Sequence, residues 1–63
     1  MDWKDWIDRN VFVKLRSGAV YSGKVIDVDT SPKEFCFIEM IDKFGDKITI
    51  CNSEIEKIKE EKR

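Results

Sequence analysis

Apolar and polar residues alternate along the first half of this chain, and the period of two predicts β-strands. Residues 11–16 read Val-Phe-Val-Lys-Leu-Arg, the pattern of a strand with one buried face. Ser17-Gly18 is a hairpin turn signal. A long strand over 19–29 follows, and its apolar positions change parity around Gly23. Since a parity change at a glycine indicates a bulge or a sharp bend, we expect the strand to change direction there.

The second half of the chain predicts three more strands. Residues 30–34 form a polar loop around Pro32, and the segment 35–41 is apolar on both parities, as in a strand buried on both faces. A tight turn over 43–46 leads to a strand over 47–51. Asn52-Ser53 is a very short connection that predicts a positive φ at Asn52. Ile55 and Ile58 anchor the last strand, and residues 60–63 are a charged, solvated tail.

The N-terminal segment, residues 1–10, predicts a short α-helix from Asp2 to Asn10. Trp3, Trp6 and Ile7 stand at i, i+3 and i+4 and form one apolar stripe. Asp2 can cap the helix, and Asn10 can end it in the left-handed conformation. A helix this short needs tertiary support. Its stripe therefore either covers one end of the strands or offers an aromatic pair to a partner.

Together these elements predict a mostly-β fold in one domain over residues 1–63. A short N-terminal α-helix over 1–10 precedes a five-stranded, strongly bent barrel over 11–59, with the tail at 60–63. A bent second strand among five is typical of SH3-like and OB-like barrels.

The small size of the chain raises the question of what stabilises it. A chain of 63 residues buries only about 60% of its unfolded surface, so small scaffolds rely on disulfides, metals or oligomerisation. Cys36 and Cys51, without any histidine, do not make a zinc site. Both lie in apolar runs and are interpreted as buried thiols, with a disulfide as the alternative. Oligomerisation remains as the stabilising factor.

Charge excludes some functions. Charged residues make up 40% of the chain, yet the net charge is −1, whereas a DNA-coating protein carries a basic excess. The charge-rich composition is typical of proteins from hot environments. No signal peptide and no apolar run near the ~20 residues of a membrane helix is found. We therefore expect a soluble cytoplasmic protein that does not contact membranes.

Two motifs in order resemble the Sm and Sm-like (LSm) family over nearly the whole chain. The first runs from the apolar residues 11–15 through Gly18 and Gly23 to Asp29, and the second places isoleucines at 50, 55 and 58. The resemblance implies an Sm-like barrel that forms a homo-oligomeric ring and binds single-stranded RNA, including U-rich strands. In that family the fourth strand pairs with the fifth strand of a neighbour.

The chain departs from the family at the residues that hold RNA. The family's base-binding Asn falls at Lys33, or at Phe35 if the loop is gapped, and the Arg-Gly pair of the second motif is Cys51-Asn52. Cysteine lacks the planar charged fork of arginine. Asp29 is the only residue of the pocket that is preserved by identity.

Each candidate RNA-binding residue has two interpretations. Asp29 either orients a neighbour or accepts from a base edge, or it forms a turn at the strand end. Asn52 is a turn residue or offers its amide. Lys33 is solvated or meets a phosphate, and Phe35 is a core residue or stacks on a base.

The last two strands are the candidate oligomer interface. Edge strands present unpaired backbone groups, and a closed ring satisfies them. The segments 47–51 and 54–58 are short and contain no proline. The interface residues implied by the resemblance are Ile48, Ile50, Ile55 and Ile58.

The expected function is RNA binding as a scaffold or chaperone, without cofactor or metal. The expected partners are RNA, further copies of the chain and a second Sm-like protein. The alternative is an interaction and assembly module that has lost the base pocket. Catalysis is not expected, because the chain has no histidine to activate a nucleophile. Asp27 and Asp29 share a strand face that either holds a cation weakly or faces solvent.

Overall fold

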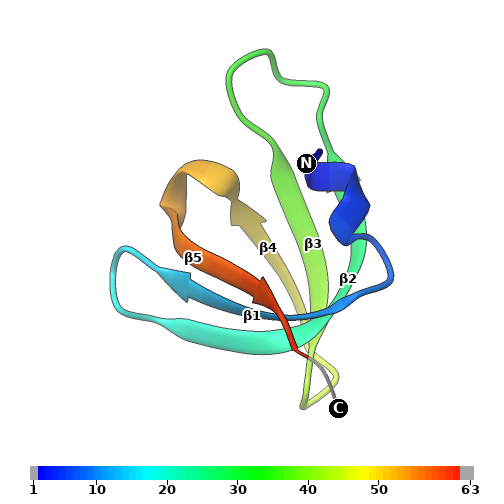
Figure 1. Ribbon diagram of the computed structural model, residues 1–63, viewed down its shortest axis with the longest axis vertical. Coiled ribbons are helices and arrows are strands. Elements are labelled where there is room, and N and C mark those ends of the chain that lie inside the picture. The colour runs from blue at the N-terminus through cyan, green and yellow to red at the C-terminus, as the bar shows by residue number, and fades with distance from the viewer. Residues whose placement is uncertain (1, 62–63) are drawn as a thin grey trace.

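The computed structural model describes residues 2–61 and consists of antiparallel strands in one bent sheet (Figure 1). The elements are η1 Trp3–Trp6, β1 Asn10–Leu15, β2 Val20–Asp29, β3 Phe37–Asp42, β4 Lys47–Cys51, η2 Asn52–Glu54 and β5 Ile55–Glu60, where η marks a 3-10 helix. The spatial order is β4-β3-β2-β1-β5. The mostly-β class and the five strands are therefore confirmed within residues 2–61. The sheet is open, and β4 and β5 are its two edges.

The long strand β2 joins the two halves of the sheet. It pairs with β1 over residues 20–24 and with β3 over residues 23–29. Between Val25 and Asp27 two steps of β2 advance against one step of β3, which is a β-bulge at Ile26. The sequence pattern predicts a bulge or a sharp bend at Gly23, and the bulge lies three residues further along the strand.

Gly23 has a different role, which is to let two backbones approach each other. A Cβ atom built at this position would overlap the carbonyl oxygen of Ile41 and lie 2.8 Å from the Cα of Asp42. Glycine allows such an approach because it has no side chain. The close approach of the backbones at Gly23 and the bulge at Ile26 are thus two separate features of β2.

The predicted N-terminal α-helix is wrong, since the segment contains only one short 3-10 turn. Asp2 caps this turn as expected, accepting from Lys4 N at 3.4 Å. After Ile7 the chain leaves the helical path, and Asp8 takes the left-handed conformation with φ 71°. Asp8 N then donates to Val25 O at 2.8 Å. Because a helix this short gains few internal bonds, the bonds to β2 decide the conformation.

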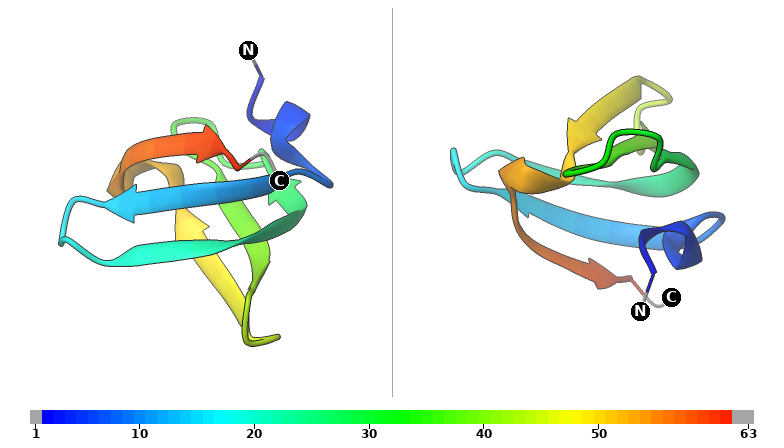
Figure 2. Two further views of the ribbon diagram at one scale, coloured as in Figure 1. Left: turned by 60° about the horizontal axis from the view of Figure 1, so that its bottom comes forward. Right: turned by 90° about the horizontal axis from the view of Figure 1, so that it is seen from above.

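The core lies between the two halves of the bent sheet (Figure 2). Its buried side chains come from every strand and from the loop before β3: Val11, Val13, Leu15, Val25, Val28, Cys36, Ile38, Met40, Ile50 and Ile55. The stripe of Trp3, Trp6 and Ile7 packs against this core half-buried, as expected of a covering segment. Cys36 is buried, Cys51 is half-buried, and both are free thiols rather than a disulfide.

Several strand boundaries and one turn differ from expectation. β3 begins at Phe37 instead of Phe35, and β5 extends to Glu60, which leaves Glu61 as the described part of the tail; residues 62 and 63 lie outside the described range. β1 begins one residue early, at Asn10. Asn52 starts the 3-10 turn η2 and does not have a positive φ. Within residues 2–61 no helix has the length and apolar character to cross a membrane.

Candidate functional site

Three of the four predicted RNA-binding residues lie around one shallow hollow. The connection 30–36 leaves the sheet between β2 and β3, and η2 lies between β4 and β5, at the same end of the sheet (Figure 1). Lys33, Phe35 and Asn52 line a hollow of about 230 Å³ between these connections. Trp3 of η1 also lines it. The fold thus brings together four residues that are up to 49 positions apart in sequence.

Phe35 is an exposed aromatic residue. It precedes β3 and is 41% exposed, so the interpretation as a core residue is wrong. Its ring packs edge-to-face on Phe37, with centroids 5.4 Å apart at 87°. This contact covers part of the ring, and the exposed remainder offers aromatic surface on which a base can stack. Lys33 is exposed on the same loop and can meet a phosphate beside such a base.

Asn52 fastens the two connections to each other. Its Oδ1 accepts from Cys36 N at 3.1 Å, and its own backbone N donates to Cys36 O at 2.9 Å. The amide oxygen therefore has a structural role that neither sequence interpretation included. These bonds leave the amide nitrogen as the group that a ligand would meet.

Asp29 does not line this hollow, and its observed role is to form a turn. Ser31 N and Ser31 Oγ donate to its Oδ1 at 2.9 and 2.6 Å. The Ser31 hydroxyl, and next the Ser31 backbone N–H, lower the pKa of the Asp29 carboxyl below its ordinary value. Asp29 lines a neighbouring hollow of about 250 Å³ with Asp27, Phe37, Glu39 and Thr49. Asp29 thus lines a different hollow from the other three candidates.

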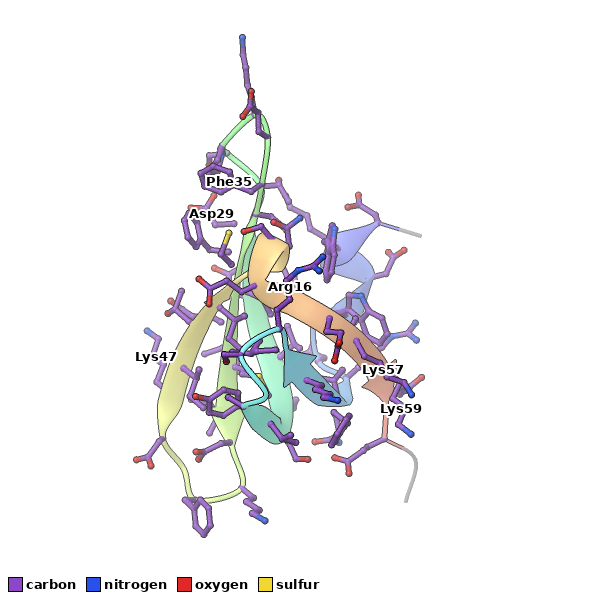
Figure 3. All side chains as sticks on the ribbon, turned by 90° about the vertical axis from the view of Figure 1, so that its left-hand side faces the viewer. Arg16, Asp29, Phe35, Lys47, Lys57 and Lys59 are labelled. Carbon is purple, nitrogen blue, oxygen red and sulfur yellow. The ribbon has the colours of Figure 1, made fainter. Side chains whose placement is uncertain are left out.

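Arg16 is a residue that the motifs did not point to. It follows β1, and its backbone N donates to Glu54 O at 2.9 Å while its Nε donates to Ser53 O at 3.1 Å. Its side chain thus lies beside η2 (Figure 3). Sequence reasoning missed Arg16 because its position depends on the pairing of β1 with β5, which the order of strands along the chain does not reveal.

The four isoleucines of the predicted interface face inward. Ile50 and Ile55 are buried in the core, and Ile48 and Ile58 pack against it half-buried. Their strands β4 and β5 are nevertheless the edges of the sheet. A partner strand would therefore pair with backbone groups of these edges, and these side chains would contribute by holding the edges in place.

The described residues offer no metal centre. Among residues 2–61 no three side chains of His, Cys, Asp or Glu are placed to hold one ion. Asp27 and Asp29 are both exposed on the outer surface of β2. This exposure agrees with the solvent-facing interpretation of the pair.

Comparison with known proteins adds no further assignment. The chain matches no family model, no curated protein and no solved structure. The Sm-like resemblance therefore stays a prediction from the two motifs.

Proposed function

We propose that this protein is an Sm-like RNA-binding protein that assembles into a homo-oligomeric ring. The observation that carries the proposal is the hollow at one end of the sheet, where Lys33, Phe35 and Asn52 meet Trp3. An exposed aromatic ring, a cation and an amide donor are the groups that recognise a stacked base, a phosphate and a base edge.

The open sheet supports the assembly. β4 and β5 each have one side that no strand of residues 2–61 covers. Pairing the β4 edge of one copy with the β5 edge of the next would satisfy both and close a ring. A ring repeats the hollow once in each subunit, so weak contacts to one strand of RNA add up.

The first test is the binding of oligouridine to the full chain, titrated with salt. Phe35→Ala should weaken binding about 5- to 150-fold, because one stacked base is worth about 1–3 kcal/mol. Lys33→Gln should reduce the slope of log affinity against log salt by about 0.7, the value of one phosphate contact. Phe44→Ala is the matched control, since Phe44 is an exposed aromatic residue on the turn between β3 and β4. Absence of binding at low salt would refute the proposal.

A second function is favoured by the polar groups that are already occupied. Asp29 Oδ1 is bonded to Ser31, and Asn52 Oδ1 is bonded to Cys36. A barrel that pairs its edges and has lost base recognition would be a protein interaction and assembly module. Its partners would then resist nuclease treatment, whereas partners held through RNA would be released.

Light scattering at several protein concentrations separates the assembly from the binding. A fixed mass of several subunits supports the ring, with or without RNA. A monomer or dimer at all concentrations contradicts the ring and leaves a small interaction domain.

A further inference from the structure

The outer surface of the sheet carries its charges in two separate faces. The basic face lies on β1 and β5 and consists of Phe12, Lys14, Lys57 and Lys59. The acidic face lies on β2 and β3 and consists of Asp27, Asp29, Phe37 and Glu39. On both faces the neighbouring residues along the strands, such as Val13 and Val28, are buried in the core, so the faces point outward.

The two faces have the same layout with opposite charge. On the basic face Lys14 is directly opposite Lys57, and Phe12 is opposite Lys59. On the acidic face Glu39 is opposite Asp27, and Phe37 is opposite Asp29. Each face thus has one pair of like charges beside one pair of a phenylalanine with a charge.

The two pairs of like charges are unfavourable within the subunit, because like charges directly opposite each other on neighbouring strands repel. Ion pairs within the subunit relieve only one member of each pair. Lys14 Nζ lies 3.3 Å from Glu56 Oε2, and Lys47 Nζ lies 3.4 Å from Glu39 Oε1. Within residues 2–61 no ion pair involves Lys57, Lys59, Asp27 or Asp29. Their local contacts are with neutral groups: Asp29 Oδ1 accepts from Ser31, and Asp27 Oδ1 accepts from Val28 N. Lys59 Nζ lies 5.7 Å from the centroid of the Phe12 ring. No ion pair among the described residues therefore neutralises these four exposed charges.

We propose that the basic face of one copy binds the acidic face of a second copy, head to tail. Lys57 and Lys59 are two residues apart on β5, as are Asp27 and Asp29 on β2, so both pairs are spaced by about 6.7 Å. The acidic face also holds the hollow of about 250 Å³ that its four residues line with Thr49, into which a lysine side chain from the second copy enters. Any two residues at i and i+2 on a strand have this spacing, so the opposite charge of the two faces is what points to a second copy of this chain as the occupant.

The position of the faces sets the form of the association. The β1–β5 half and the β3–β4 half lie on opposite sides of the core, so their outer faces point away from each other (Figure 2). Figure 3 places Lys57 and Lys59 side by side on β5, well apart from Asp29. A contact between different faces leaves one basic and one acidic face unpaired in a dimer, so copies continue to add head to tail, into a filament or a closed ring. This contact is independent of RNA binding and of the pairing of β4 with β5.

The test compares the mass of the full chain at several salt concentrations by sedimentation velocity. The mass is expected to grow as ionic strength falls from about 0.5 M to about 0.02 M, because screening of exposed charges weakens over this range. The pairing of β4 and β5 edges relies on backbone bonds and responds little to salt. A mass that does not depend on salt at any protein concentration overturns the proposal.

Charge reversal on each face gives the decisive comparison. The variants K57E/K59E and D27K/E39K should each lose the growth at low salt, and an equimolar mixture should recover it, because each supplies the face that the other lacks. The control K24E/K43E changes the net charge as much as K57E/K59E, and its two exposed lysines lie outside both faces. Equal loss in the control, or no recovery in the mixture, overturns the proposal.

Two further measurements separate this contact from misfolding and from RNA binding. Circular dichroism checks that each variant folds, and K57Q/K59Q replaces K57E/K59E if the reversal unfolds the chain. Oligouridine binding is measured in parallel with association. If K57E/K59E loses only RNA binding and associates like the wild type, the basic face binds polyanions and the proposal is wrong.

Discussion

Gly23→Ala is expected to destabilise the fold more than any other replacement of a glycine by alanine in the chain. The added Cβ would overlap the Ile41 carbonyl oxygen and lie 2.8 Å from Asp42 Cα, and both obstacles are backbone atoms of β3. A backbone cannot rotate away as a side chain can, so β2 and β3 must separate. The separation strains the pairs of Gly23 with Asp42 and of Lys24 with Ile41.

The magnitude follows from two contributions. Overpacking costs about 1–3 kcal/mol, and one weakened ladder bond costs about 1 kcal/mol, which together make about 2–4 kcal/mol. A domain of 63 residues has a free energy of unfolding of about 3–9 kcal/mol. The variant should therefore lose about a fifth or more of its stability, and Tm should fall by about 8–30 °C.

Gly18 provides the matched control, because it tests conformation without overlap. Its φ is +97° and a Cβ would meet nothing within 4 Å. Gly18→Ala should cost about 1–2 kcal/mol through the left-handed conformation. Asparagine tolerates that region, so Gly18→Asn should be milder than Gly18→Ala, whereas Gly23→Asn should be worse than Gly23→Ala.

The measurement is urea unfolding at fixed protein concentration, so that any assembly contributes equally. If Gly23→Ala unfolds within about 0.5 kcal/mol of the wild type, the margin of an ordinary surface change, the close approach of β2 and β3 is refuted. The same conclusion follows if Gly18→Asn is less stable than Gly18→Ala while Gly23→Asn is more stable than Gly23→Ala.

Three further changes test the site and the core. Asn52→Ala should lower the free energy of unfolding by about 1–3 kcal/mol, because Cys36 N loses its acceptor in a part-buried position. Asn52→Asp keeps an acceptor and should lose less stability. Equal losses of stability in the two variants would contradict the role of Asn52 Oδ1 as that acceptor. Ser31→Ala should raise the pKa of Asp29 toward its ordinary value, followed by NMR titration of the carboxyl. Since the bonds favour the ionised carboxylate, their contribution to folding stability is present above the ordinary pKa and disappears as pH falls through the lowered pKa of the folded state. A titration of Asp29 that Ser31→Ala leaves unchanged would argue against the bonds. Met40→Ala should lower the free energy of unfolding by about 2–5 kcal/mol, because Met40 is fully buried. The control Val20→Ala, at a residue 51% exposed, should change it by no more than about 0.5 kcal/mol. Similar losses in both variants would count against the core as described.

The candidate site could be predicted only in part. Lys33, Phe35 and Asn52 were found from their positions relative to the two motifs, and they do meet at one hollow. Trp3 and Arg16 were missed as neighbours of that region, because nothing local in the sequence says which connections share an end of the sheet. Asp29 was placed in the pocket by identity, but its bonds to Ser31 turn it into a local structural residue.

The sequence by itself determined the strands, because the alternation of side chains between two faces is a local property of extended backbone. It also determined the core, since Val11, Val13 and Ile38 are buried as the pattern predicts. Only the tertiary structure decided the N-terminal segment, where bonds from Asp8 and Arg9 to Val25 prevail over a helical pattern. It alone separated the bulge at Ile26 from the close contact at Gly23, because both depend on the position of β3. The physical reason is that periodicity assigns each residue to a face, whereas pairing between strands distant in sequence assigns its neighbours.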